Sequence, residues 1–335
     1  MNKRTLSAAA FAATIAFIAS TAGTAEAALK RITIGTNPQG STYFLIGSGL
    51  AKLFQEKLDI KSTAQPHAGS SVYLPLMEAG EITLGLNSSL DSGLAFNGIA
   101  PYKDATKSVR SIARIWILPY AYFVKENSGI KTVADLKGKR VVVDFKTNVS
   151  LGQANRTILS TAGLKDSDVT AIDSGGVVAS INMVIEDRVD AAPVAIAMPA
   201  MRKAHATVPD GLRILSLGPA ANDDFMNKGM AGLYTYQARN TKTLPFVRED
   251  TLIAAFDTYL NAGTSVSDED AYALAKTMHG NWAQLQKDYP PLRATKIEAL
   301  TPKNNPIPYH PGAVKYWKEA GLFTAENEKH DAALK

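Results

Sequence analysis

Short loops rich in hydroxyl and amide side chains are the parts of this chain best suited to chemistry. One loop, Gln39 to Tyr43, stands directly before a helix-like run from Phe44 to Leu58, and Gly69-Ser70-Ser71 stands before a second such run. The start of a helix presents free backbone N–H groups and the positive end of its dipole, so hydroxyls placed there suit a carboxylate or a phosphate. The alternative is that Ser41 or Thr42 only caps its helix, although one serine can do both.

Two further polar loops follow predicted strands. Asn87 and Ser88 come after a strand predicted over 82–86, and Lys146 to Val149 come after a strand predicted over 139–144. Ligands of α/β proteins bind outside the carboxyl ends of parallel strands, which is where these loops would lie. Lys146 is the only cation in these loops and favours an anionic ligand, with a lysine that extends into solvent as an equal alternative.

An aromatic side chain completes the candidate set. Trp116 stands in a long apolar run from Ser111 to Lys125 and, with Tyr120 of the same run, could form a wall of the pocket, with packing in the core as the alternative. The candidate ligand-binding residues are Gln39, Gly40, Ser41, Thr42, Tyr43, Gly69, Ser70, Ser71, Asn87, Ser88, Trp116, Lys146, Thr147, Asn148 and Val149.

The motifs of common enzymes are missing from the sequence. It contains no G-x-S-x-G, H-E-x-x-H or G-x-x-x-x-G-K-[ST] pattern, and its five histidines lie far apart. We therefore expect a protein that is not an enzyme, with no catalytic residue, no cofactor and no bound metal ion. Acidic pairs that come together only in space stay open, so an exported hydrolase is the alternative from another class.

The same order of elements occurs twice along the chain. The first half has a strand (31–35), a polar loop, a helix-like run (44–58), a loop (67–71), a second helix-like run and a strand (82–86). The second half has a strand (139–144), a polar loop, a helix-like run (151–162), a loop (173–177), another helix-like run and a strand (189–194). This alternation predicts two α/β lobes, each a mostly parallel sheet flanked by helices. Because the loops of both lobes would meet at one crevice, the pattern indicates a clamp for a small molecule.

The remaining segments connect and complete these lobes. The apolar run from 111 to 125 predicts a strand that leaves the first lobe, breaks at Pro119 and enters the second. Helical patterns are expected over 246–260, over 267–289 and over 316–320. We expect lobe I to comprise 28–119 plus 226–335, and lobe II to comprise 120–225.

The N-terminus has the pattern of a Sec-type export signal. Lys3 and Arg4 precede an apolar stretch that is too short to span a bilayer, and Ala25-Glu26-Ala27 forms an A-x-A cleavage site. We expect removal of residues 1–27 and a soluble mature protein in the periplasm, with a retained membrane anchor as the less favoured alternative. The chain has no cysteine, which excludes disulfides, and its formal net charge of +5 is scattered, which argues against nucleic acid as a partner.

Several short motifs, in this order and spacing, resemble the TAXI-type solute receptors of TRAP transporters over essentially the whole mature sequence. They are Ile34-Gly35-Thr36 with Gly40, Thr42 and Tyr43; Gly69-Ser70; Glu78-Ala79-Gly80-Glu81; Ser128 to Lys131; Asp135 to Val141; Ala162-Gly163-Leu164; Pro308 to Gly312; and Tyr316 to Leu322.

The resemblance implies a two-lobed periplasmic binding protein, type II-like, whose lobes are joined by two crossing strands. It implies a monomer that closes on a small organic anion (a dicarboxylate, a 2-oxo acid or an acidic amino acid) and delivers it to an ion-driven TRAP membrane permease. The family's Gly/Ser-rich loop in the second lobe is replaced here by Asp144 to Ser150, which makes Lys146 the expected source of charge. The receptor of an ABC importer with the same fold is the nearest alternative, and a ligand-binding sensor partner is a further one.

Overall fold

A computed structural model describes residues 29–100 and 102–335 of the chain. The predicted signal segment, 1–27, lies outside the described residues. No helix within the described ranges is long and apolar enough to cross a membrane.

The first lobe is built around three parallel strands, β1 (Arg31–Thr36), β2 (Lys61–Pro66) and β3 (Leu84–Ser88), in the order β2-β1-β3. Helix α1 (Thr42–Leu58) covers this sheet with the apolar stripe that the sequence predicted, since Ile46, Leu50 and Phe54 are fully buried. The chain leaves α1 through Asp59, whose φ of 55° is left-handed and ends the helix.

The second lobe is built around β5 (Arg140–Phe145), β6 (Thr170–Ser174) and β7 (Ala192–Ala195). Strands β5 and β6 pair in parallel, and the backbone N–H of Val142 donates to the carbonyl of Ala191, which ties β5 to the segment that enters β7. Helices α4 (Ser150–Ser160), α5 (Val177–Ile185) and α6 (Pro199–Thr207) belong to this lobe.

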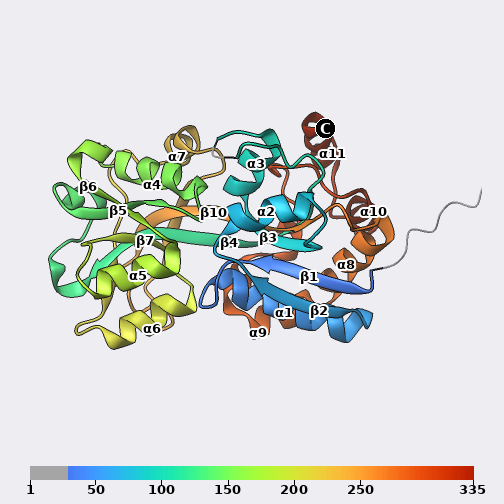
Figure 1. Cartoon of the computed structure of the whole chain (residues 1–335), viewed down its shortest axis with the longest axis horizontal. Coiled ribbons are helices and arrows are strands. Elements are labelled where there is room, and N and C mark those ends of the chain that lie inside the picture. Colours follow the sequence, from blue (N-terminus) through green and yellow to red (C-terminus); the bar gives the residue numbers. More distant parts are fainter. Residues whose placement is uncertain (1–28, 101) are drawn as a thin grey trace, which may run out of the picture.

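Two long antiparallel strands join the lobes. Strand β4 (Arg110–Lys125) and strand β10 (Thr251–Ala262) run side by side through the middle of the molecule (Figure 1). Residues 258–262 of β10 pair with β3 of the first lobe, and 120–123 of β4 pair with β7 of the second, so the pairing of β4 with β10 joins the two lobes. The predicted α/β fold with two lobes and two crossing strands is confirmed.

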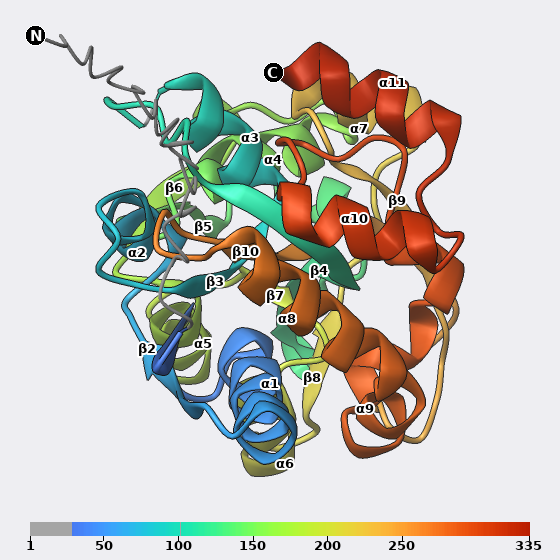
Figure 2. The ribbon, with the colours of Figure 1, turned by 90° about the vertical axis from the view of Figure 1, so that its right-hand side faces the viewer.

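The remaining elements extend the lobes. Strand β8 (Leu212–Ile214) pairs with the end of β4, and β9 (Tyr234–Ala238) pairs with the start of β10. Figure 2 shows α8 and α10 side by side over the first lobe. The other helices are α2 (Ser70–Glu78), α3 (Ser89–Asn97), α7 (Asp223–Gly229), α8 (Asp268–Gly280), α9 (Trp282–Asp288), α10 (Pro311–Glu319) and α11 (Ala325–Leu334).

Three predictions of local structure are wrong. The helix expected over 246–260 is largely strand β10, because a strand buried on both faces is apolar at nearly every position and cannot be told from a buried helix by periodicity. The break expected at Pro119 is absent, since this residue lies inside the continuous β4 and its carbonyl accepts from the N–H of Ile196. The helix expected over 267–289 is divided at Asn281 into α8 and α9.

Candidate functional site

A cavity lies between the lobes, at the ends of helices from both of them. It has ≈ 540 Å³ of free space, part of it open to solvent. The residues that line it are Asn37, Pro38, Ser41, Thr42, Tyr43, Ser70, Ser88, Asp91, Leu118, Tyr120, Asn148, Leu151, Val177, Val178, Ala195, Met198 and Phe256. We call this the main cavity. Helices α1 to α6 all begin at it, so its wall includes six helix N-termini.

The start of α1 contributes the largest polar part of the wall. The Ser41 Oγ accepts from the backbone N–H of Phe44 at 3.1 Å, so this residue caps the helix and also lines the cavity. The Thr42 Oγ1 and the Asn37 Oδ1 are buried and have no hydrogen-bond partner among the described residues. An unpartnered buried polar atom costs free energy, so both atoms are positioned to bind a polar group that enters the cavity.

A buried carboxylate lies at the start of α3. The Ser88 Oγ donates to Asp91 Oδ2 at 2.9 Å, and the Tyr102 hydroxyl donates to Asp91 Oδ1 at 2.8 Å. Burial is the main cause that raises the pKa of Tyr102 well above its usual value, and the nearby Asp91 adds to it, so this phenol stays a donor. Asp91 is the one charged side chain among the described residues that line the main cavity.

Apolar side chains form the opposite part of the wall. Tyr120 and Phe256 come from the two crossing strands, and their ring centroids lie 5.7 Å apart. The Tyr120 hydroxyl donates to Asn155 Oδ1 at 3.0 Å and is therefore occupied within the protein. Val177 and Val178, in the first turn of α5, add aliphatic surface from the second lobe. The main cavity thus suits a small solute with one polar end and an apolar body.

The lobes contact each other directly beside the main cavity. The backbone N–H of Ala200 donates to the carbonyl of Gly40 at 3.1 Å, and the N–H of Val149 donates to the Ser71 Oγ at 3.3 Å. Gly69 lies so close to the opposite lobe that a Cβ there would overlap the carbonyl oxygen of Thr147. The structure therefore has the lobes closed on each other around the main cavity.

The structure brings together many of the predicted ligand-binding residues. Six of them line the main cavity: Ser41, Thr42, Tyr43, Ser70, Ser88 and Asn148. Five others lie in or next to the contact between the lobes: Gly40, Gly69, Ser71, Thr147 and Val149.

Four predicted residues lie elsewhere. Gln39 and Lys146 are exposed and do not line the main cavity, so the expected cation of the second lobe is not part of its wall. Asn87 is buried behind it, where its Oδ1 accepts from Asn261 Nδ2 at 3.2 Å. Trp116 is buried against Tyr43, with ring centroids 5.1 Å apart, and lines a neighbouring cavity.

The lining residues that sequence reasoning missed are Asn37, Pro38, Asp91, Leu118, Leu151, Val177, Val178, Ala195, Met198 and Phe256, whereas Tyr120 was a candidate, with Trp116, for a wall of the pocket. Two signals could have found some of them. Val177 follows Gly176 as Ser70 follows Gly69 in the first half, and Asp91 stands three residues after Ser88, the spacing of a helix cap and its partner. Leu118 and Phe256, on the crossing strands, gave no such signal.

Several solved structures of transport and solute-binding proteins are similar to this chain in fold. A structure described as a periplasmic transporter is 10% identical, covers 90% of this chain and 95% of that chain, and has a TM-score of 0.53. PhnD1 from Prochlorococcus marinus, in complex with methylphosphonate, is 13% identical, covers 78% of this chain and 91% of that chain, and has a TM-score of 0.51. The substrate-binding protein of an amino acid ABC transporter is 14% identical, covers 77% and 98% of the two chains, and has a TM-score of 0.47. At such identities these likenesses concern the fold.

A model of one protein family, the NMT1-like family, matches residues 34–321. The match extends from within β1 to the glycine that follows α10, and so includes both lobes and both crossing strands.

Proposed function

Since this chain belongs to the NMT1-like family, we propose that it is the solute-binding receptor of a membrane importer. It captures a small solute between its lobes and delivers it to a permease. The observation that carries this proposal is the main cavity itself, whose wall is shared by both lobes and by both crossing strands. A ligand that contacts both lobes binds the closed state more tightly than the open state and therefore shifts the population toward closure.

We propose binding rather than catalysis at this cavity. No histidine is among the described residues that line it, and two of its three serines, Ser41 and Ser88, are engaged in helix caps. An exported hydrolase would need a nucleophile paired with a base at hydrogen-bond distance. Recovery of the bound solute unchanged, checked by mass spectrometry after long incubation, separates the two functions.

The solute class that we propose is a small organic anion. Helices α2 and α5 begin after Gly69 and Gly176, and neither start has a side-chain cap, so N–H groups of their first turns stay available to an oxyanion. Methylphosphonate, which is bound in the PhnD1 structure, is one such small organic anion. Lys146 lies outside the main cavity, so there the anion meets neutral donors and not a lysine.

For the permease we propose an ABC-type importer first. The matched family model is that of NMT1-like proteins and does not single out the TAXI receptors. A TRAP permease is the second candidate, on the motifs around Ile34-Gly35-Thr36 and Pro308 to Gly312. Uptake in cells separates them, because an ABC importer needs ATP, whereas a TRAP transporter stops when the ion gradient is collapsed.

We further propose export to the periplasm as a monomer, and a hinge where β4 and β10 cross. The sequence predicted that the chain returns to the first lobe at residue 226. Because residues 251–255 of β10 pair with β9 and residues 258–262 pair with β3, we propose that the chain returns within β10 instead. In this proposal lobe II extends from 120 to about Phe256, the part of β10 that faces the main cavity.

Thermal-shift screening of the mature protein against organic acids, amino acids and phosphonates tests the receptor function. At a concentration of 100 times Kd, a ligand of the native state adds about 2.7 kcal/mol of stability. Val178→Trp, which fills the main cavity from α5, should abolish the shift. Val72→Trp is the matched control, because Val72 lies in the first turn of α2 and is 43% exposed. The proposal fails if no compound stabilises the protein, or if every compound that stabilises it keeps its full shift in Val178→Trp.

A further inference from the structure

A second cavity lies next to the main cavity and shares Thr42, Leu118 and Ala195 with it. It has ≈ 910 Å³ of free space, part of it open to solvent. Its wall comes from β4, from the segment after β7, from β9, from the loop 241–244 and from the 3-10 helix Pro290–Ala294. We call it the outer chamber. Like the main cavity, it is bounded by both lobes.

The charges that line the outer chamber are positive. Arg202 of α6 and Arg239, just after β9, are its charged residues, and no acidic residue is among the described residues that line it. Arg202 has no ion-pair partner among the described residues, whereas Arg239 pairs with Asp250 at 2.5 Å. The main cavity has the opposite sign, since its charged residue is Asp91. The two adjoining spaces therefore differ in the sign of the charged side chains that line them, while the backbone N–H groups at the starts of α2 and α5 remain available to an oxyanion in the main cavity.

Two buried donors at the outer chamber have no partner within the protein. The chain has three tryptophans, and two of them donate their indole N–H to a backbone carbonyl: Trp282 to Thr295 at 3.1 Å and Trp317 to Ile112 at 2.8 Å. Trp116 is equally buried, at 1% exposed, but its Nε1 has no partner among the described residues. The Thr42 Oγ1, in the wall between the two cavities, is also unpartnered. An indole N–H can only donate, so it requires an acceptor.

We propose that the outer chamber binds an acidic group, a carboxylate, sulfonate or phosphonate, with Arg202 and Arg239 as its charged partners and Trp116 and Thr42 as neutral donors. Guanidinium groups bind such oxyanions with paired hydrogen bonds. Arg202 has no competing ion pair among the described residues, whereas Arg239 would bind the anion beside its ion pair with Asp250. This inference rests on the proposed receptor function and deepens it. The acidic group belongs either to the captured solute, which then extends past Thr42, or to a separate small anion.

The test compares acids with uncharged compounds of the same shape. Succinate is compared with succinamide and benzoate with benzamide by calorimetry on the mature protein, and methylphosphonate and inorganic phosphate are titrated as two further anions. Arg202→Ala combined with Arg239→Ala should weaken the best acid at least tenfold and leave an uncharged compound unchanged. Arg188→Ala, an exposed arginine of the same lobe outside both cavities, and Lys146→Ala should each change the affinity less than twofold.

Three results would overturn the inference. The double variant could bind the acid as well as the original protein, the loss could occur only in Lys146→Ala, or uncharged compounds could bind while no acid does. In all three the receptor function still stands. If neither acids nor uncharged compounds bind, the receptor function fails as well.

The cavity-filling Val178→Trp separates the two sources of the acidic group. If the acid is one end of a solute that spans both cavities, this variant should abolish its binding. If the acid is a separate anion in the outer chamber, binding should remain and should still depend on Arg202. Either result, with loss of affinity in the double arginine variant, supports the outer chamber as an anion site.

Discussion

Thr42 shows how a side chain that is placed to bind a ligand can lower the stability of the ligand-free protein. The sequence predicted this residue in the loop before the helix, whereas it is the first residue of α1 and its neighbour Ser41 performs the capping. The Thr42 hydroxyl is thereby left buried without a partner among the described residues, in a side chain that is 2% exposed. A ligand that forms a hydrogen bond with this hydroxyl removes the free-energy cost of leaving it unpaired. That gain adds to the free energy of binding.

We expect Thr42→Val to leave the stability of the ligand-free protein unchanged or to raise it by up to about 1 kcal/mol, because valine has the same shape and no unpaired hydroxyl. Solute affinity should fall. Thr157→Val is the matched control, since the Thr157 Oγ1 donates to the carbonyl of Gln153 at 2.9 Å and its removal should destabilise the protein. Urea unfolding and calorimetry measure both quantities. A clear loss of stability in Thr42→Val would contradict this view of the hydroxyl.

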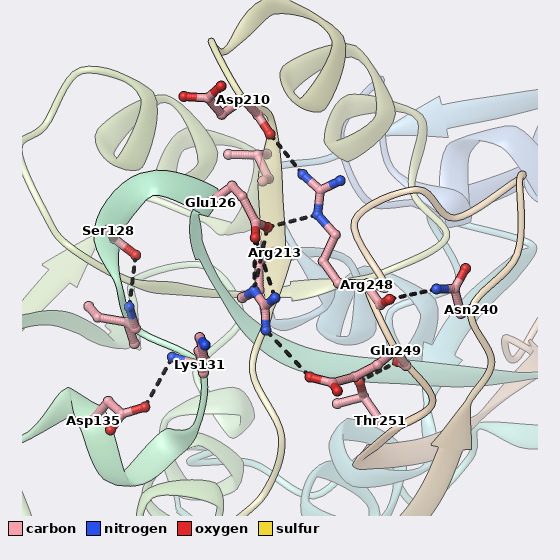
Figure 3. Close-up of polar contacts among 12 residues, drawn as sticks. Glu126, Ser128, Lys131, Asp135, Asp210, Arg213, Asn240, Arg248, Glu249 and Thr251 are labelled. Atoms are coloured by element: carbon pink, nitrogen blue, oxygen red, sulfur yellow. Dashed lines mark hydrogen bonds and ion pairs between the residues drawn. The ribbon is translucent and has the colours of Figure 1, made fainter.

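At the scale of elements, the segments around the crossing strands are held by charged groups. Figure 3 shows Glu126, directly after β4, between the guanidinium groups of Arg213 of β8 and Arg248 of the segment before β10. The Arg248 Nε donates to Glu126 Oε2 at 2.7 Å, and its Nη2 donates to the carbonyl of Asp210 at 2.7 Å. Three segments far apart in the chain are thus joined at one carboxylate.

This network predicts a pH-dependent stability. Burial acts to raise the pKa of Glu126, but hydrogen bonds from Arg213 and Arg248 outweigh it and hold the pKa below its usual value. A depressed folded-state pKa means that the contribution is fully present above the ordinary pKa of about 4.5 and is lost as pH falls through the folded value. Glu126→Gln should therefore be less stable at pH 7, by about 1–3 kcal/mol, and the difference should shrink below pH 4.5. A constant difference in urea unfolding across this range would contradict the assignment.

A second charged pair lies between the crossing strands themselves. The Arg114 Nη1 donates to Asp257 Oδ1 at 3.1 Å, and the Tyr234 hydroxyl donates to the same oxygen at 2.9 Å. Both charged side chains are largely buried, at 14% and 9% exposed. Removal of one charge leaves the other buried and uncompensated, so Asp257→Asn should cost about 3 kcal/mol in urea unfolding, and Tyr234→Phe less. Equal losses of stability in the two variants would show that the ion pair with Arg114 is not the main contribution of Asp257 to the stability of the fold.

At the scale of the whole molecule, closure of the lobes depends on close approach at Gly69. A methyl group there would overlap the carbonyl of Thr147, whereas a methyl group at Gly175, in the corresponding loop of the second lobe, would have no neighbouring atom within 4 Å among the described residues. The packed contact between the closed lobes cannot make room for an added methyl group, so the overlap destabilises the closed state.

We expect Gly69→Ala to lower the apparent solute affinity about tenfold or more, because it reduces the population of the closed state that binds. Gly175→Ala should bind as the original protein does. Small-angle scattering with saturating solute should show a compact particle for Gly175→Ala and a more extended one for Gly69→Ala. Full affinity and full compaction in Gly69→Ala would show that closure does not need this contact.

The sequence by itself determined the α/β class, the paired order of strands and helices, and the loops that meet at the cavity. These features depend on local periodicity, on glycine and serine at helix starts, and on the rule that loops gather at the carboxyl ends of parallel strands. That is why Ser41, Ser70, Ser88 and Asn148 were found.

Only the tertiary structure decided the rest. Leu118, Tyr120 and Phe256 face the main cavity because β4 and β10 pair there, and a pairing between segments more than 100 residues apart leaves no local pattern. Buried on both faces, β10 even resembled a helix in sequence. Charge shows the same limit: Lys146 has the right type and the right loop, yet it lines neither cavity, while Arg202 and Arg239, for which the sequence predicted no binding role, line the outer chamber. Whether a side chain faces a cavity depends on how distant segments pack, and that is settled only when the chain has folded.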